Sequence, residues 1–231
     1  MTDTPAEPTT QAEGRPPLTR ERVLRAGIAL ADEAGIDGLS MRRLGQVLGV
    51  EAMSLYNHVA NKDDLLDGMV ELVVAEFEPP AAGPDWRAEV RRSSRSAYDA
   101  LLRHRWACPL LVTRGNPSPP QLAYSDAVLG CLRAAGFSVE LAHYAFHALD
   151  SHVVGFTLWQ MSFPFKNQAE LVDLGRRFLA QLPAADYPHL TEHIRYHLEP
   201  ASAEGQSAFD FGLELVLDSL ERLRAVAASA K

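Results

Sequence analysis

Apolar residues recur at intervals of three and four along most of this 231-residue chain, which is the spacing of amphipathic helices. The Val, Ile and Tyr residues do not form alternating runs, and Leu and Ala dominate the apolar content. We therefore expect an all-α fold. Besides two short helices within residues 40–62, helices are predicted at residues 19–34, 62–78, 85–104, 118–134, 138–162, 167–182, 186–198 and 207–228.

Residues 40–62 have the pattern of two short helices joined by a tight turn. Ser40 is a good N-cap for the first helix, because its hydroxyl can accept a backbone N–H. Gly49 stands where a helix commonly ends in a left-handed residue. The apolar stripe of the first helix is predicted to consist of Leu44, Val47 and Leu48, and that of the second of Leu55 and Val59. A helix-turn-helix has this form, and so does an ordinary hairpin inside a helical bundle.

The remaining faces of these two helices carry small, polar and aromatic side chains. Such groups at the start of a second helix can reach base edges, while Arg, Ser, Tyr and His can hydrogen-bond phosphates. The pattern therefore favours recognition of double-stranded DNA. The residues predicted to contact DNA are Ser40, Arg42, Ala52, Met53, Ser54, Tyr56, Asn57, His58 and Lys62.

Charge supports DNA binding at one region and not over the whole surface. The chain carries a formal net charge of −8, which argues against a protein that coats nucleic acid. Between Arg15 and Lys62, seven basic and five acidic residues give a local charge of +2. The acidic remainder would repel DNA and limit contact to this region.

Short motifs follow one another in a fixed order through the N-terminal third. They are Ala34-Gly35, Gly38-Leu39-Ser40, Leu48-Gly49-Val50, Leu55-Tyr56, His58-Val59 and Asn61-Lys62. In this order they resemble the N-terminal domain of the tetracycline repressor (TetR) family. The resemblance implies a three-helix DNA-binding domain, with a fourth helix that links it to an effector domain. Glu51 departs from the family, which often has a Ser cap there.

A second, patchier set of motifs extends the resemblance toward the C-terminus. It comprises Trp86, Leu101-Leu102, His104-Arg105, Thr113-Arg114, Gly136-Phe137-Ser138, Tyr144-Ala145, Gly155 and Phe211-Gly212-Leu213-Glu214-Leu215. The motifs are similar to the tetracycline repressors themselves, which implies the same helical scaffold with an internal pocket. Those repressors place a metal-binding histidine shortly before the Thr-Arg pair, where this chain has Leu110-Leu111-Val112. The resemblance therefore predicts neither a magnesium–tetracycline ligand nor a cofactor.

The resemblance also suggests which residues contact a small-molecule effector. An arginine among them would favour an anionic or carbonyl-bearing ligand. The alternative is that these polar side chains satisfy one another inside a bundle. Alignment with the family's ligand contacts gives Ser93, Arg114, His143, Phe146, His147 and Ser151, and Trp159 is predicted to add a flat apolar wall.

Proline and glycine at residues 79–84 break the chain between the two sets of motifs. The predicted organisation is a disordered tail (1–17), a helix-turn-helix domain (18–62), a connecting helix with linker (63–84) and a helical effector-binding and dimerisation domain (85–231). The helices at 138–162 and 207–228 are apolar on more than one side. They predict a homodimer that binds a near-palindromic operator, unless both stripes are internal core.

Other classes of protein receive less support from the sequence. Common nucleotide-binding and hydrolase motifs are absent, so we expect no enzyme, although turnover of a ligand in the second domain and a DNA-independent protein scaffold remain alternatives. Cys108 and Cys131 lack CxxC spacing and are expected to be reduced. No membrane span or signal sequence is expected, which favours the cytoplasm. A metal site on the helical stripe of His189, His193 and His197 is an open alternative.

Overall fold

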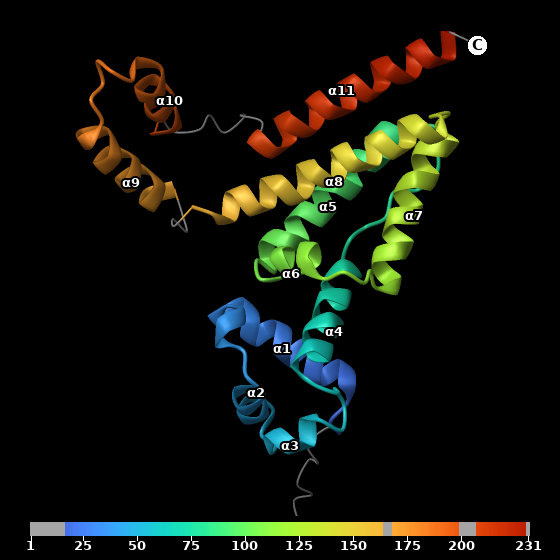
Figure 1. Ribbon diagram of the computed structural model, residues 1–231, viewed down its shortest axis with the longest axis vertical. Helices are drawn as coiled ribbons and strands as arrows, with labels where there is room; N and C mark the ends of the chain where they lie inside the picture. Colours follow the sequence, from blue (N-terminus) through green and yellow to red (C-terminus); the bar gives the residue numbers. More distant parts are fainter. Residues whose placement is uncertain (1–16, 164–167, 199–206, 230–231) are drawn as a thin grey trace, which may run out of the picture. The chain divides into compact units, whose positions relative to one another are not determined.

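The computed structural model describes residues 17–163, 168–198 and 207–229, and within these ranges the chain forms helices and no strands (Figure 1). The expected all-α fold is confirmed. The chain divides into two compact units between Met69 and Val70, inside α4. The predicted tail, 1–17, lies outside the described residues except for Pro17. The helices are α1 (Arg20–Ala34), α2 (Met41–Leu48), α3 (Ala52–Leu55), α4 (Lys62–Val74), α5 (Trp86–Arg103), α6 (Ala107–Thr113), α7 (Pro119–Ala134), α8 (Val139–Met161), α9 (Gln168–Gln181), α10 (Pro188–Leu198) and α11 (Ala208–Ser229), with a 3-10 turn η1 (Ile36–Gly38).

The N-terminal unit, which ends at Met69, closes around a small apolar core. Helices α1 and α4 cross closely at two glycines, because a Cβ at Gly27 would lie 2.8 Å from the Met69 sulfur. A Cβ at Gly68 would likewise lie 2.8 Å from a methyl group of Leu24. The crossing brings leucines of α1, α2, α3 and α4 together. The side chains buried in this core include Val23, Leu30, Leu39, Leu44, Leu55 and Leu65.

The C-terminal unit, from Val70, is built on the packing of α5, α7, α8 and α11, while α9 and α10 pack on one another. Aromatic side chains of α5, α8 and α11 pack together and hold these helices in place. The rings of Tyr98 and Phe209 stack with centroids 3.9 Å apart, and His152 Nε2 lies 2.9 Å from the Phe209 carbonyl oxygen. The core between these helices includes Val90, Leu101, Leu132, Phe137, Leu149, Leu213 and Leu217.

Ion pairs join α5 to α11 along the edge of this core. Arg91 and Arg87 both bind Glu214, the latter at 2.6 Å, and Arg95 binds Asp210 at 2.7 Å. The hydrogen bond from Arg91, followed by that from Arg87, lowers the pKa of Glu214 to about 2 against the desolvation that opposes it. These pairs fix the register of the terminal helix on α5.

Helix α6 was not predicted. Its third residue is Pro109, and the N–H groups of a first helical turn have no partner within the helix, so proline is tolerated there. The predicted helix at 62–78 is also shorter than expected. It ends at Val74, and Phe77 follows in a turn closed by its own N–H on the Val74 carbonyl at 3.0 Å.

Candidate functional site

The turn between α2 and α3 is held by local backbone chemistry. The Ser40 hydroxyl accepts the Arg43 N–H at 3.2 Å, which confirms the predicted N-cap of α2. Gly49 ends the helix in the left-handed region, with φ 64° and ψ 42°, as predicted. Behind it, a Cβ at Gly45 would lie 2.8 Å from the Val50 carbonyl oxygen, so the backbone of the turn passes directly over this glycine. The two helices can approach this closely only with glycine at position 45.

Helix α3 has the inward face that was predicted but fewer helical residues. Leu55 is fully buried and Val59 is 2% exposed, as expected. After Leu55 the chain tightens, because the N–H groups of Tyr56 and His58 bond to carbonyls three residues back, at 3.3 and 2.9 Å. Glu51 at the start of α3 makes no side-chain cap. The outward residues after Leu55 are therefore presented by a turn and not by a continued α-helix.

A clamp at Arg20 holds this turn in place, and sequence reasoning did not single it out. The guanidinium donates to the His58 carbonyl oxygen at 2.9 Å and to both carboxylate oxygens of Asp64, at 2.9 and 2.6 Å. Asp64 also accepts the Ala60 N–H at 2.7 Å, and the Arg20 and Ala60 hydrogen bonds lower the pKa of the carboxyl group. Arg20 and Asp64 are 44 positions apart, so only the tertiary fold brings them together. They position the outward face of α3.

All nine residues predicted to contact DNA have accessible side chains, and none is buried. Met53 is 75% exposed and Tyr56 43% exposed, so the outward face offers an apolar and an aromatic side chain as well as polar groups. Val47 was predicted to belong to the inner stripe of α2, and that prediction was wrong. It is 59% exposed, because the stripe of this short helix is completed by Leu44, Gly45 and Leu48. The outward face as a whole is therefore broader than predicted.

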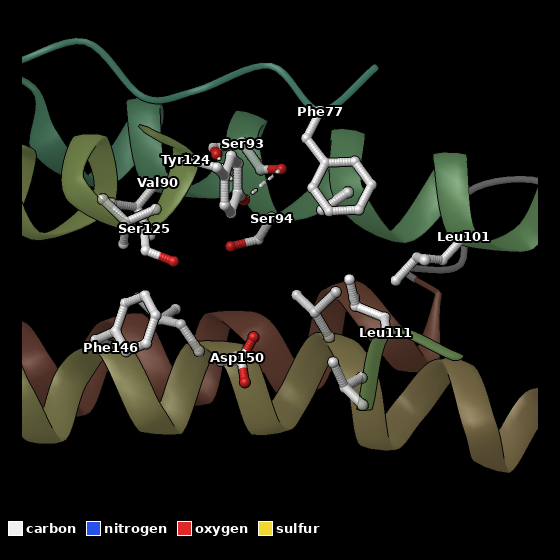
Figure 2. A pocket seen from close by; sticks show the side chains of 15 residues that line it. Phe77, Val90, Ser93, Ser94, Leu101, Leu111, Tyr124, Ser125, Phe146 and Asp150 are labelled. Atoms are coloured by element: carbon white, nitrogen blue, oxygen red, sulfur yellow. Dashed lines mark hydrogen bonds between the residues drawn. The ribbon is translucent and has the colours of Figure 1, made fainter. Parts of the chain in front are cut away.

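The C-terminal unit contains a cavity lined by α5, α6, α7, α8 and the segment that follows α4 (Figure 2). The volume inside it that is open to the centre of a water-sized sphere is about 60 Å³. Its walls are mostly apolar, as in many small-molecule sites. The lining residues are Phe77, Val90, Ser93, Ser94, Ala97, Leu101, Leu111, Tyr124, Ser125, Val128, Phe146, Leu149, Asp150, Val153 and Val154.

A few polar groups project into this apolar space. The Ser93 hydroxyl donates to the Tyr124 hydroxyl oxygen at 2.9 Å, and the Tyr124 ring meets Phe77 edge-on with centroids 5.3 Å apart. Burial raises the pKa of Tyr124, so its hydroxyl remains a neutral donor. Figure 2 shows the Asp150 carboxylate on α8 opposite the hydroxyl groups of Ser94 and Ser125.

The residues predicted to bind a ligand divide into two groups. Ser93 on α5 and Phe146 on α8 line the cavity. The other five, which are not among its lining residues and stay predictions, are Arg114, His143, His147, Ser151 and Trp159. Arg114 directly follows α6, and the remaining four are exposed on α8, where the rings of His143 and His147 lie 4.6 Å apart.

Sequence reasoning missed other residues of the cavity. The predicted ligand contacts did not include Phe77, Tyr124, Ser125 or Asp150. The helical period gives a usable signal for Asp150, because it lies one turn after Phe146 on the same face of α8. Tyr124 and Phe77 come from separate helices or turns, and no local pattern relates them.

Metal and thiol chemistry receive no support within the described ranges. No group of three or more His, Cys, Asp or Glu side chains there could hold a metal ion. His189 and His193 are exposed on α10, and the side chain of His197 lies outside the described residues. Cys108 and Cys131 are free and buried, as expected, and burial raises the pKa of the Cys108 thiol to about 11. In the part of the chain that the structure describes, no helix is long and apolar enough to cross a membrane.

A helix-turn-helix with an exposed face, followed by a helical unit with an apolar cavity, is the architecture of a ligand-responsive transcriptional regulator. Comparison with known protein families agrees. Residues 23–69 match the model of bacterial regulatory proteins of the tetR family, and residues 79–224 match the tetracyclin repressor-like C-terminal domain. The chain belongs to the TetR family of bacterial transcriptional regulators.

Individual relatives are similar over nearly the full length. The class D tetracycline repressor of Escherichia coli is 34% identical over 209 residues, which cover 88% of this chain and 89% of the repressor. An HTH-type transcriptional regulator of Saccharopolyspora erythraea is 33% identical and covers 91% of this chain and 87% of its own. The crystal structure of Streptomyces coelicolor ActR in complex with actinorhodin superposes with a TM-score of 0.71 and 32% identity, over 89% of this chain and 96% of that one.

Proposed function

We propose that this TetR-family regulator is a repressor that binds a near-palindromic operator as a homodimer and is released by a small molecule. The observation that carries this proposal is the exposed outward face of α2, α3 and their flanks, on which all nine predicted DNA contacts are accessible while Leu44 and Leu55 are buried on the inner face. The polar members of the outward face can hydrogen-bond base edges and phosphates. In this proposal, residues 18–62 form the DNA-binding part, residues 63–84 the connector and residues 85–231 the effector-binding part.

Selection from a random DNA pool tests this proposal. We expect purified protein, at low salt, to recover sequences with two inverted half-sites whose centres are about one helical turn, 34 Å, apart. Folded protein that enriches no sequence would contradict DNA binding. Enrichment of a single half-site without an inverted repeat would contradict the homodimer.

The homodimer is supported by the outer faces of α8 and α11, two helices that pack against each other. Large apolar side chains remain uncovered on both of them, in addition to the residues that fill the core. Exposed apolar side chains on two neighbouring helices are what a helical protein interface would cover. The exposed residues are Val139, Tyr144, Leu158 and Trp159 on α8, and Phe211, Leu215, Leu223 and Val226 on α11.

The segment after α4 supports a route from the cavity to the DNA-binding part. Phe77 lines the cavity, and its neighbours are fixed to α5. Arg103 binds Glu76 at 2.7 Å, and the Glu78 N–H donates to the Ser96 hydroxyl at 3.0 Å. A ligand that displaces Phe77 would therefore shift the end of α4. A coupling of about 1–3 kcal/mol changes DNA affinity about 5–150-fold. Unchanged hydrogen–deuterium exchange in residues 70–79 during effector release would contradict this route.

We further propose that the protein acts in the cytoplasm, where operator DNA is accessible, and that it binds its effector without turnover. The family relationship supports both points, since the similar proteins are transcriptional regulators. Mass spectrometry of an effector that has been incubated with the protein tests the second. An altered effector, formed in amounts that exceed the protein, would contradict it.

A further inference from the structure

The cavity has an unusual charge balance for a pocket that is otherwise apolar. Among its lining residues, Asp150 is the one with an acidic side chain, and none is basic. Asp150 lies on α8, which also contributes Leu149, Val153 and Val154 to the cavity lining. The predicted basic contact, Arg114, is not part of this lining. The cavity is therefore negative where the aligned residues suggested that it would be positive.

The Asp150 carboxylate has no hydrogen-bond partner within the described residues, unlike the acidic residues that fix the scaffold. Glu214 and Asp210 each bind an arginine, and their pKa values are lowered. Burial instead raises the pKa of Asp150, and the nearby His147 opposes this effect. Although nearby chain desolvates the carboxylate, Asp150 as a residue is exposed to solvent. A ligand that covers it would displace that water, so the ligand has to supply a hydrogen-bond donor in its place.

The field of this carboxylate reaches across the cavity. Its negative charge contributes to the raised pKa of Tyr124 on α7 and of Cys108 on α6. The same field would oppose an anionic ligand and favour a cationic one. Figure 2 shows the hydroxyl groups of Ser94 and Ser125 in the same space, where they can accept further hydrogen bonds from a donor.

We propose that the effector is an aromatic or similarly apolar molecule that carries an ammonium group, with the ammonium at Asp150 and the apolar part against Phe77, Tyr124 and Phe146. This inference rests on the proposed function, because it names the chemical class of the effector of the same cavity. An ammonium supplies both the charge and the N–H donors that Asp150 lacks. An aromatic ring fits the edges and faces that the three aromatic side chains offer.

Three matched probes test the charge preference by isothermal titration calorimetry: 1-naphthylmethylamine, 1-naphthylmethanol and 1-naphthylacetate. They share one ring system and differ in their head group. We expect the amine to bind at least about tenfold more tightly than the acetate, since a hydrogen bond to a charged group contributes this much or more. Equal or tighter binding of the acetate, or no binding of the amine at millimolar concentration, would overturn the proposal.

Variants assign the preference to Asp150. Asp150→Asn should weaken the amine about tenfold and change the affinity of the alcohol less than about threefold, because only the charge is removed. Asp126→Asn on α7 makes the same chemical change at an exposed position outside the lining and should leave all three affinities unchanged. An amine-to-acetate ratio that Asp150→Asn does not alter would refute the assignment.

Operator binding, measured on the same preparations, separates this inference from the proposed function. Protein that binds its selected operator but shows no preference for the amine retains the proposed function and loses the effector class. If the protein binds the amine through Asp150 but enriches no DNA, the ligand site is supported. Its role as the effector site of a repressor is then contradicted.

Discussion

The candidate functional side chains face outward to solvent in the N-terminal unit and inward to a cavity in the C-terminal unit. In the N-terminal unit, Met53 on a four-residue helix and Tyr56 in the turn after it face outward. A serine cap, a left-handed glycine and the Arg20 clamp hold this part of the chain. In the C-terminal unit, long helices turn their side chains inward around a cavity with one unpaired carboxylate. The outward surface suits a large, polyanionic partner, and the cavity suits a small one. The difference shows how one chain can separate recognition of DNA from recognition of a signal.

If two copies are needed to hold two outward surfaces in register, disrupting the dimer should have the largest effect. Leu215→Glu places a charge on the exposed apolar face of α11. We expect dissociation into monomers in sedimentation velocity, and operator affinity that falls on the order of 1,000-fold toward the non-specific level. Leu122→Glu, at a similarly exposed leucine of α7, is the matched control and should remain dimeric. A dimeric Leu215→Glu variant with normal affinity would place the interface elsewhere.

A second change should damage the outward surface and spare the cavity. A valine at position 45 would press on the Val50 carbonyl and on the Ala52 backbone, so α2 and α3 must separate. Overpacking of this kind costs about 1–3 kcal/mol, which corresponds to a loss of operator affinity of up to about 100-fold for Gly45→Val. Binding of 1-naphthylmethylamine should be unchanged. A variant that binds DNA normally would show that this close approach is not required.

A third change should act on the scaffold of the C-terminal unit. Glu214→Gln removes the charge that Arg91 and Arg87 bind, and we expect thermal or urea unfolding to show a loss of about 2 kcal/mol at pH 7. The folded-state pKa of Glu214, about 2, lies below its ordinary value of 4.5. Its contribution is therefore present above pH 4.5 and is lost as the pH falls toward 2. The stability difference between the two proteins should shrink over that range, and a difference that grows would contradict the assignment.

The smallest expected effect is a gain. Gly130 lies in the interior of α7, and a Cβ there would meet no atom within 4 Å. Gly130→Ala should raise the free energy of unfolding by about 0.5–1 kcal/mol, because alanine restricts the unfolded chain and favours the helix. Operator binding should not change. A destabilised variant would mean that this face of α7 is covered in the assembled protein.

The contrast between the units also explains what could be predicted from the sequence. Ser40, Gly49 and Asn61 act on backbone groups a few residues away, so their roles follow from local pattern. The side-chain oxygen of Asn61, for example, accepts the Asp64 N–H at 2.9 Å. Arg20 and Asp64 were missed because their contact depends on how α1 and α4 cross. The limits of local pattern are clearest where chain segments far apart must meet.

The cavity shows the same limit more strongly. Ser93 and Phe146 were placed by alignment, whereas the contacts of Tyr124 and Phe77 depend on the packing of α7 and of the turn after α4. The position of Val47 was predicted wrongly, and α6 was not predicted, for simpler reasons. A single apolar residue does not reveal on which side of a two-turn helix it lies. Pro109 argues against a helix in the sequence, but the first turn of α6 tolerates a proline.

The central claim, that the outward face of α2 and α3 binds DNA, is tested most directly by operator affinity as a function of salt concentration. The proteins to compare are the wild type, Arg42→Ala, Tyr56→Ala and the control Tyr196→Ala, which changes an exposed tyrosine of α10. We predict that both changes at α2 and α3 weaken binding. Arg42→Ala should also reduce the slope of log K against log salt concentration by about 2 per dimer, one phosphate contact in each half-site. Tyr196→Ala should match the wild type. Affinities and slopes that are identical in all four proteins would contradict the claim.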